Sequence, residues 1–386
     1  MFIKEESGII MVENSCVVNK KSVTKNKALK RAQKGTRKYY QERLFQKSVN
    51  APKVRMGKLA DLNNVGYKVI SDVELADDIN VSLSRDELIQ LCKESRLTGR
   101  SGNGFEVSRK IEMFQKNNGI LIINAVECDP GLVTDSWLYR NKKYYIEQGA
   151  KLLKEALGLD NVILATQEPL QDICGVQQIK VINRFPMGYE KYLIKHVLDI
   201  EILNDELPQD KGIIVMNLQT VIAIAELRQN KMAGQYKYIT VHNTYTAETK
   251  VVRVHIGDRV DTVAANCFLQ NEVKNYYIYA GSGAFNCHKS TEGEIITDTT
   301  GYIAIGEMPS YEEAGKCKSC GACTRNCPAG VIVHKLIKYV DENGMSNINK
   351  SNPFNASACI GCGACTYGCR AGKDVRKMVK RVKDSI

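Results

Sequence analysis

The sequence contains no long hydrophobic run, and this absence constrains where the protein works. No apolar stretch approaches the roughly eighteen consecutive residues of a membrane-spanning helix. The opening residues, MFIKEESGII, also lack the basic-then-apolar order of a secretory signal. Both absences favour a cytoplasmic protein without a direct membrane span. In a reducing compartment, fourteen cysteines are more often metal ligands or buried thiols than disulfides.

Histidine is also scarce, and its placement argues against a histidine-based metal site. The chain has five histidines, and none clusters with the others at metal-ligand spacing. His196 falls on an amphipathic helical stretch, and His255 falls in a strand-like run. We therefore interpret the histidines as structural.

The chain is long enough for several domains and carries an uneven positive charge. Its 386 residues, 44% of them hydrophobic, can form two or three domains with cores of their own. The net charge of +11 is concentrated between Lys20 and Lys58 and again from Arg370 onward. Such basic segments are compatible with an acidic protein partner, with a solvated helix face or with nucleic acid.

Two nearly identical cysteine frames carry the strongest chemical signal. They read CKSCGACTRNC (317–327) and CIGCGACTYGC (359–369), each with the spacing C-x2-C-x2-C-x3-C. This is the spacing of two-cluster bacterial ferredoxins, in which the fourth cysteine of each run binds the other cluster. The sequence therefore predicts two [4Fe–4S] clusters. One is bound by Cys317, Cys320, Cys323 and Cys369, and the other by Cys359, Cys362, Cys365 and Cys327.

Zinc is the alternative metal for these frames. Zinc ribbons pair two C-x2-C knuckles and leave no role for the third cysteine of each run, so iron–sulfur clusters are favoured. Arg370 stands where a proline usually follows the second run. We expect the cysteines outside the frames to be ordinary buried or partly buried thiols, with Cys128 set apart because it lies inside a second motif. These cysteines are Cys16, Cys92, Cys128, Cys174, Cys267 and Cys287.

The middle of the chain alternates between helical and strand patterns. Residues 84–87 form a capping box, and the continuous apolar run 119–126 is typical of a strand covered on both faces. The alternation predicts βαβ units and a mostly parallel sheet. The further strands expected are 161–166, 179–185 and 212–217, and the further helices 150–158, 189–198 and 220–227.

A glycine-rich loop precedes the first central strand. It contains Gly99, Gly102 and Gly104 and opens a helix, an arrangement that can bring backbone N–H groups close to a phosphate. The strand that follows ends in NAVECDPG, which places further polar side chains at the carboxyl edge of the sheet, where such sheets bind ligands. By itself, the loop is a weak signal.

The combined motifs resemble a known family. GRSGNGFEVSRK and LIINAVECDPG are similar to the flavin-binding signature of the NADH-oxidising flavoprotein subunit of respiratory complex I. The similarity is closer to the C subunit of the Rnf electron-transport complex and its relatives, cobalamin reductase and the proline-reductase-associated electron-transfer protein. It runs from about residue 84 to the second cysteine frame and includes RFPMGYEKYLIK and DKGIIVMNLQTVIAI in order.

The resemblance implies bound FMN, with NADH as the electron donor. It places the glycine-rich loop under the flavin phosphate, Lys110 and Asn124 against FMN, Phe105 in a stack on the nucleotide, and Asp129 at the NADH hydroxyls. The chain departs from the family at Glu106, which replaces a proline and brings a negative charge to the loop. The full implied set is Gly99, Arg100, Gly102, Asn103, Gly104, Phe105, Lys110, Asn124, Glu127, Asp129, Phe185, Gly188, Glu190, Asn217 and Thr220.

Ordinary structural roles are the alternative for the acids in this set. Glu127, Asp129 and Glu190 can also cap helices or form surface ion pairs, and Lys110 taken alone resembles a solvated helix residue. No general acid or base is needed for hydride transfer, so no catalytic side chain is predicted.

The expected fold class is α/β: a Rossmann-like FMN/NADH domain with a mostly parallel sheet, a small β-grasp (SLBB-like) domain and a C-terminal two-cluster ferredoxin-like α+β domain. The β-grasp expectation rests on half-buried strand patterns at 236–243, 249–257 and 275–285. We expect this domain to space the flavin from the clusters. The boundaries expected are 1–60 for a basic helical extension, 61–234 for the flavin domain, 235–305 for the β-grasp domain and 306–386 for the cluster domain.

The function predicted is electron transfer from NADH through FMN and two [4Fe–4S] clusters to a partner protein or complex. Rnf-type membrane subunits or a soluble reductase are compatible acceptors, and the former would hold the protein at the cytoplasmic face of the membrane. Two alternatives stay open. One is an electron carrier that uses only the clusters and does not oxidise NADH, and the other is a basic zinc protein that binds nucleic acid, a partner that is not expected.

Overall fold

A computed structural model describes the protein as two compact units. One unit holds two β-sheets with their helices, and the other holds the cysteine frames. Residues 1–60, the predicted basic extension, lie outside the described residues except for the strand β1 (Ile10–Val12). The structure describes residues 10–12, 66–69, 82–116, 118–129, 131–183, 185–203, 206–268, 277–308, 311, 316–344 and 354–386.

The first sheet is mostly parallel, as the alternating pattern predicts. Its order is β1-β5-β4-β3-β6, with β3, β4, β5 and β6 parallel and β1 antiparallel at the edge beside β5. The chain runs outward from β3 to β5 and then returns to place β6 on the other side of β3. That reversal between β3 and β6 is where sheets of this kind bind ligands. The bounds are β3 Ile120–Ala125, β4 Asn161–Thr166, β5 Gln177–Lys180 and β6 Ile213–Asn217.

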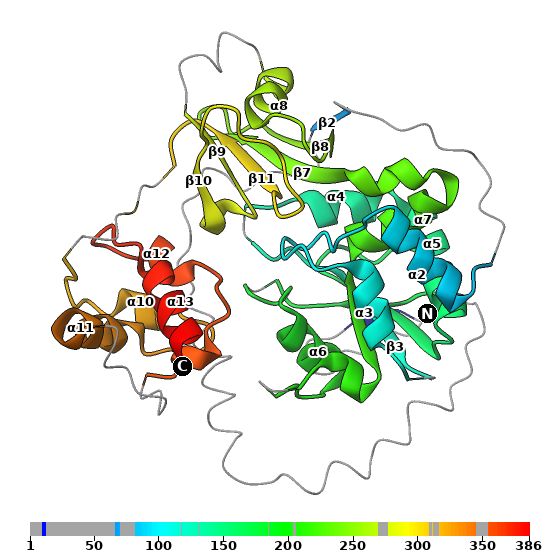
Figure 1. Ribbon diagram of the computed structural model, residues 1–386, viewed down its shortest axis with the longest axis horizontal. Helices are drawn as coiled ribbons and strands as arrows, with labels where there is room; N and C mark the ends of the chain where they lie inside the picture. The colour runs from blue at the N-terminus through cyan, green and yellow to red at the C-terminus, as the bar shows by residue number, and fades with distance from the viewer. Residues whose placement is uncertain are drawn as a thin grey trace, which may run out of the picture. The chain divides into compact units, whose positions relative to one another are not determined.

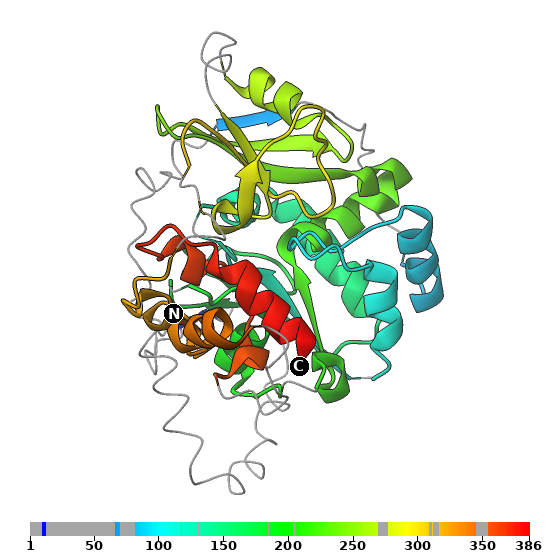
Figure 2. The same ribbon diagram turned by 60° about the vertical axis from the view of Figure 1, so that its left-hand side comes forward.

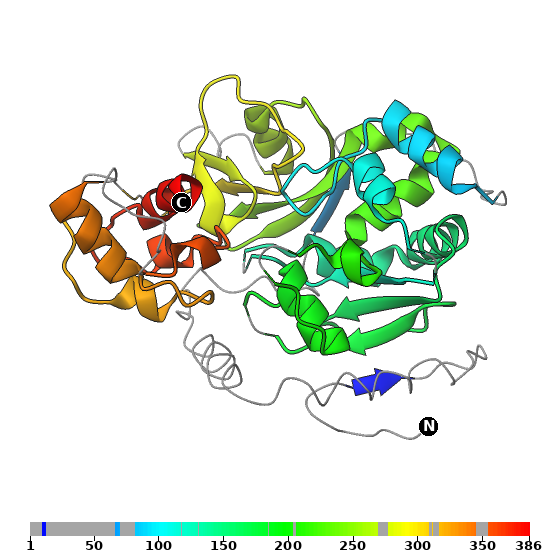
Figure 3. The ribbon, with the colours of Figure 1, turned by 60° about the horizontal axis from the view of Figure 1, so that its bottom comes forward.

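Helices cover this sheet and supply most of the core. The capping box at Ser84 is confirmed, since its hydroxyl accepts from Glu87 N–H and the Glu87 carboxylate accepts from Ser84 N–H. Figure 3 shows α6 together with the parallel strands. The helices are α2 Arg85–Glu94, α3 Val107–Met113, α4 Thr134–Asn141, α5 Lys143–Ala156, α6 Glu190–Leu198 and α7 Leu218–Gln229, with short 3-10 turns at Pro208–Lys211 and Lys231–Gln235.

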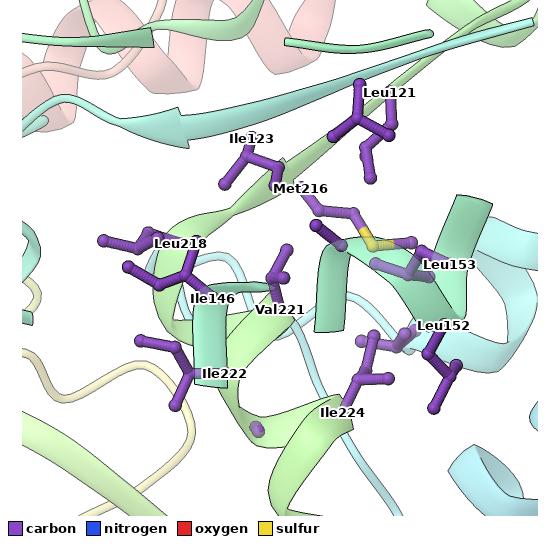
Figure 4. Packing of buried hydrophobic residues seen from close by; sticks show 14 of the residues in the cluster. Leu121, Ile123, Ile146, Leu152, Leu153, Met216, Leu218, Val221, Ile222 and Ile224 are labelled. Carbon is purple, nitrogen blue, oxygen red and sulfur yellow. The ribbon is translucent and has the colours of Figure 1, made fainter. Parts of the chain in front are cut away.

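The core of the first unit lies where α5 and α7 meet the parallel strands. Figure 4 shows Met216 of β6 and Ile123 of β3 facing Leu153 of α5 and Val221 of α7. Helix α7 is buried from Leu218 to Leu227 because it packs against strands of both sheets. The sequence TVIAIAEL is apolar on nearly all sides of the helix, which is typical of a helix covered by protein on all sides.

The second sheet has the β-grasp arrangement. A hairpin of β7 (Tyr236–Asn243) and β8 (Thr249–His255) leads into α8 (Val260–Cys267), and β11 (Tyr302–Ile305) returns parallel to β7. The order is β10-β9-β11-β7-β8-β2. Figures 1 and 2 show α8 on one side of this sheet and α4 and α7 on the other. The remaining elements are β2 Gly66–Val69, β9 Ile278–Gly281, a 3-10 turn at Ala284–Asn286 and β10 Cys287–Lys289.

Burial of β7 differs from the half-buried strand expected. Ile239 and Val241 pack on the α8 side, whereas Tyr238 belongs to the core of the α/β part, so both faces of the strand are covered. Polar side chains complete the second interface: Gln219 of α7 accepts from Tyr238 N–H (2.6 Å) and donates to its carbonyl (3.1 Å). The expectation of a half-buried strand was wrong, because the order of polar and apolar residues in one strand does not show which helices cover its second face.

Two further strands differ from the sequence predictions. Strand β5 begins at Gln177 and ends at Lys180, short of the predicted 179–185, and the chain then enters the turn around the cis peptide bond Phe185–Pro186. Strand β2, assigned by sequence to the flavin domain, pairs instead with β8 of the second sheet. Tyr67 of β2 stacks on Trp137 of α4 with 4.5 Å between ring centroids, which ties this strand to the α/β part.

The second unit is a small helical domain around the cysteines. Its main helices are α11 (Val333–Asn343) and α13 (Val375–Ser385), and α13 is amphipathic, with Val375, Val379 and Val382 buried. Two short helices, α10 (Ala322–Arg325) and α12 (Ala364–Tyr367), lie inside the cysteine frames, and Ala356–Ala358 forms a 3-10 turn. Among the described residues, no helix has the length and hydrophobicity needed to cross a membrane.

Gly149 gives a test of the α5–α7 packing. A Cβ atom at this position would collide with the Val221 carbonyl oxygen. We therefore expect Gly149→Ala to reduce the free energy of unfolding by about 1–3 kcal/mol, the usual cost of overpacking. The exposed Lys151→Ala on the same helix is the control and should change it by less than about 0.5 kcal/mol. Equal stability of the two variants in chemical denaturation would contradict this packing.

Candidate functional site

Two asparagines anchor the carboxyl edge of the parallel sheet. Asn124 ends β3 and Asn217 ends β6, and the two are register partners in the parallel pair. The Asn124 amide donates to the Gly188 carbonyl (2.8 Å). Asn217 caps α7 by accepting from Gln219 N–H (2.9 Å). Three of the residues implied by the resemblance therefore meet at the reversal point of the sheet.

The glycine-rich loop is attached to the start of α7. Arg100 N–H donates to the Thr220 hydroxyl (3.0 Å), and Gly99 N–H donates to the Phe105 carbonyl (2.7 Å). Gly102 and Gly104 have φ of 87° and 65°, which glycine adopts without strain. Among the described residues, no acceptor is within hydrogen-bonding distance of the N–H groups of residues 101–104. Such unpaired N–H groups suit the phosphate of FMN.

The Arg100 side chain has a different role from its backbone. Its guanidinium is buried and reaches the Asp298 carboxylate (3.2 Å) and the Tyr236 carbonyl (3.2 Å), both from the β-grasp part of the chain. Thr98 also donates to Asp298 (2.5 Å). Burial lowers the pKa of Arg100 to about 10, and Asp298 opposes that shift. Asp298 was not found by sequence reasoning, since no pattern links it to the loop.

Lys110 and Glu190, which lie far apart in the sequence, form an ion pair. Their Nζ and Oε1 atoms are 3.1 Å apart, at the start of α6. Phe105 is 39% exposed, with the Arg109 guanidinium 6.0 Å from the ring centroid. Glu106, the residue that departs from the family, is exposed at the start of α3 and makes no capping hydrogen bond through its side chain.

Asp129 joins the two sheets of the first unit. Its carboxylate accepts from the N–H groups of Gly131 (3.0 Å), Ala284 (3.0 Å) and Phe285 (2.9 Å). Burial raises the pKa of Asp129, and these three hydrogen bonds oppose the shift. The capping role that sequence left as an alternative is therefore present, because the carboxylate binds the first N–H groups of the 3-10 turn at Ala284–Asn286.

Glu127 forms a buried acidic pair with Asp135, a residue that sequence reasoning missed. Glu127 accepts from Ser136 N–H (3.0 Å) at the start of α4, and Asp135 accepts from the Asn217 amide (2.8 Å). Burial and the neighbouring Asp135 raise the pKa of Glu127 well above its usual range. Burial also raises the pKa of Asp135 to about 7. Each of these neighbouring carboxyl groups therefore favours its protonated form more than an exposed carboxyl group does.

The remaining predicted residues have structural surroundings of different kinds. Cys128 is a partly buried thiol, as expected, and its pKa is raised by burial and then by Asp135, which disfavours the reactive thiolate. Gly188 is required by close packing, since a Cβ atom there would lie 2.6 Å from the Val126 carbonyl oxygen. Phe185 is half-buried and falls outside this unit. The prediction of buried thiols is wrong for Cys174, which is exposed because it lies in the surface loop before β5.

In the second unit, the cysteines surround two cavities. The first cavity is lined by Cys317, Cys320, Cys323 and Cys369, and the second by Cys327, Cys359, Cys362 and Cys365. Each set therefore takes three cysteines from one frame and the fourth from the other frame. Among the described residues, no three His, Cys, Asp or Glu side chains converge on one ion position. Four thiols around a cavity fit a polynuclear cluster.

The electrostatics of the thiols agree with this grouping. Burial raises the pKa of Cys323 to about 11, and Cys317, Cys369 and Cys320 add to the shift. Burial raises the pKa of Cys362 to about 12, and its sulfur neighbours are Cys327 and Cys359. Without metal these thiols hold their protons at neutral pH, so binding of iron releases protons. His334, taken as structural from sequence, lines the first cavity and contacts the Thr324 hydroxyl (2.8 Å).

Comparison with known families identifies both parts. Residues 92–226 match the Nuo51 FMN-binding domain, and residues 316–373 match a 4Fe-4S dicluster domain. The protein is thus an iron–sulfur flavoprotein by class, with FMN and [4Fe–4S] clusters as its cofactors.

The more specific resemblance is also confirmed: the chain is similar to curated C subunits of ion-translocating oxidoreductase complexes. It is 26% identical over 269 residues to the C subunit of the ion-translocating oxidoreductase complex of Vibrio cholerae, covering 66% of this chain and 34% of that protein. The protein of the same name from Buchnera aphidicola is 26% identical, with 66% of this chain and 53% of the relative covered.

A third relative has a more detailed name. The C subunit of the Na(+)-translocating ferredoxin:NAD(+) oxidoreductase complex of Acetobacterium woodii is 23% identical, with 70% of this chain and 64% of the relative covered. The chain therefore spans about a third to two thirds of the length of these relatives. In fold, it is similar to a chain of the NAD+-reducing [NiFe]-hydrogenase in the H2-reduced state, with a TM-score of 0.54, 16% identity, and 78% of this chain and 63% of that chain covered.

The buried acidic pair predicts a pH-dependent stability. The folded-state pKa of Asp135 is about 7, above its ordinary value of 3.8. The folded protein then binds more protons than the unfolded chain between these values, and its stability falls as the pH rises from about 4 to 7. Asp135→Asn should flatten this fall in the unfolding temperature, whereas the exposed Asp160→Asn should not. An unchanged slope in Asp135→Asn would show that the pair does not titrate in this range.

Proposed function

We propose that the protein is an NADH:acceptor oxidoreductase subunit that takes electrons from NADH and delivers them to a partner protein or complex. The observation that carries this proposal is the union, in one chain, of an FMN-binding domain and two four-cysteine cavities. When bound, FMN can exchange two electrons at once with a nicotinamide and single electrons with iron–sulfur clusters. It therefore links a two-electron donor to one-electron acceptors.

The proposal gives the residues at the sheet edge defined tasks. The unpaired N–H groups of 101–104 bind the flavin phosphate, while Asn124 and Asn217 hold the strand ends that border the flavin. Lys110 brings a positive charge to the same edge, and its ion pair with Glu190 keeps it oriented. The Glu127–Asp135 pair holds a proton beside Asn217 without adding a full negative charge there.

In the cluster domain, we propose that the eight frame cysteines are the iron ligands. Cys317, Cys320, Cys323 and Cys369 hold one cluster, and Cys359, Cys362, Cys365 and Cys327 hold the other. The grouping of the thiols around two cavities supports this set. Backbone N–H groups also contact sulfur in both halves, as from Ser319 to Cys317 and from Gly361 to Cys359, each at 3.4 Å. Hydrogen bonds to cysteine sulfur are among the factors that tune an iron–sulfur cluster.

The acceptor and location follow by analogy with the relatives. Because these are subunits of ion-translocating complexes, we propose that the acceptor is another subunit of such a complex. The protein then works at the cytoplasmic face of a membrane through its partners.

A second candidate function is an electron carrier that does not oxidise NADH. It is favoured by one observation: the Asp129 and Glu190 carboxylates, expected at the nucleotide, are both engaged by protein donors. In that case the electron donor is another protein. Electrons then pass through the cofactors to a partner protein without a bound nicotinamide.

Anaerobic absorbance spectra separate these two functions. We expect protein purified without oxygen to contain FMN, iron and acid-labile sulfide, and to lose both flavin and iron–sulfur absorbance within seconds of adding NADH. NADPH at the same concentration is the control and should react far more slowly. Bound FMN that dithionite reduces but NADH does not would favour the carrier. Protein that contains zinc and no FMN would reject both functions.

The exchange of cysteines between frames gives a second test. Cys327 lies in the first frame but at the second cavity. We therefore expect Cys327→Ser to alter the same electron paramagnetic resonance (EPR) signal as Cys359→Ser, and Cys369→Ser to alter the other. Cys174→Ser, at an exposed thiol outside the frames, should leave both signals and the iron content unchanged. If Cys327→Ser and Cys317→Ser affected the same cluster, the ligand sets would not be exchanged.

A further inference from the structure

The two cysteine cavities are related by an internal repeat, and this repeat provides a built-in comparison. Residues of the first frame have counterparts in the second, beginning with Cys317 and Cys359. The hydrogen bonding repeats as well: Thr324 accepts from His334 N–H (3.0 Å), and its counterpart Thr366 accepts from Arg376 N–H (2.8 Å). Differences between the cavities therefore reflect side chains on one shared backbone.

One N–H···S contact is repeated in the two halves, from Ser319 to Cys317 and from Gly361 to Cys359. Lys373 N–H contacts the Cys369 sulfur (3.4 Å) in the first cavity. The counterpart residue, Val331, lies at the same position after Cys327 and lines the second cavity. Net charge near a cluster is one of the factors that set its reduction potential.

The side chains at this matched position differ in charge. Val331 lines the second cavity and is fully buried, whereas Lys373 lines the first cavity and is 6% exposed. A valine is the ordinary occupant of a buried position, and a lysine there is rare unless its charge is compensated. Among the described residues, its acidic partner is Asp341, with 3.9 Å between the Asp341 Oδ1 and the lysine Nζ, and the Asp341 side chain is 45% exposed.

The other charges at the two cavities are more exposed. Lys318, at the first cavity, is exposed and has the apolar Ile360 as its counterpart. Arg376, at the second cavity, is half-buried and has His334 as its counterpart. Solvent screens these groups more than it screens Lys373, because a buried charge acts through a lower effective dielectric.

We propose that Lys373 makes the two clusters inequivalent, so that the cluster in the first cavity has the higher reduction potential and accepts the first electron. This inference rests on the proposed iron–sulfur ligation. Reduction adds one negative charge to a cluster already surrounded by four thiolates, and a buried ammonium beside it stabilises the reduced form. Val331 offers no such stabilisation to the second cluster. The protein then holds a single electron at a defined site.

The test is a redox titration of the anaerobically purified full-length protein with chemical reductant, followed by EPR. We expect two separate one-electron steps. Lys373→Met keeps the length of the side chain and removes its charge, so it should lower the potential of the upper step towards the lower one. Lys373→Arg keeps the charge and should preserve the separation. Lys318→Met removes an exposed lysine charge and is the matched control, which should leave the two potentials close to wild type.

A second measurement does not depend on the stability of the Lys373 variants. Cys320 and Cys362 are counterparts at the first and second cavities. Cys320→Ser should shift or remove the upper step, and Cys362→Ser the lower step. The inference is overturned if this order is reversed, or if Lys373→Met retains both clusters and their original separation. Absence of iron and sulfide would instead reject the proposed cluster domain. Failure to react with NADH has no bearing on this test, because the titration uses a chemical reductant.

Discussion

The parallel pairing of β3 with β6 is the constraint on which the candidate flavin site depends. It makes Asn124 and Asn217 register partners at the carboxyl edge. From Asn217 begins α7, whose Thr220 accepts the backbone N–H of Arg100 and so holds the glycine-rich loop. From Asn124, a hydrogen bond fixes the Gly188 carbonyl just before α6. If either strand slipped by one residue in this register, its asparagine would turn to the other face of the sheet and the two would no longer be partners.

The β-grasp part of the chain is more closely joined to this site than a spacer would require. Asp298 contacts both Thr98 and Arg100 beneath the glycine-rich loop, and the 3-10 turn after β9 donates two N–H groups to Asp129. A buried ion pair between Glu226 of α7 and Arg253 of β8 crosses the same interface. Removing one partner of such a pair leaves an uncompensated buried charge. The loop and the second sheet therefore share one set of polar contacts.

The cluster domain combines a symmetric backbone with asymmetric charge. Repeated spacing puts three cysteines of each frame around one cavity, and the fourth crosses to the other cavity. This exchange ties the two halves together, because each cavity takes cysteines from both frames. The two halves differ at one matched position, where the first half of the repeat has Val331 and the second half has Lys373. This local difference changes the charge beside one cavity. A carrier of single electrons gains direction when its two sites differ in this way.

The cofactors and the order of the elements could be predicted from the amino-acid sequence. The cysteine spacing, the capping box at Ser84 and the alternating apolar runs are local signals, and local backbone geometry depends on neighbours a few residues away. Other features became visible only in the folded chain: the burial of β7 on both faces, the Glu127–Asp135 pair, the contact of Arg100 with Asp298 and the buried charge of Lys373. Each of these depends on which layers and side chains meet across long stretches of chain, and no periodic pattern in one segment records its distant neighbour.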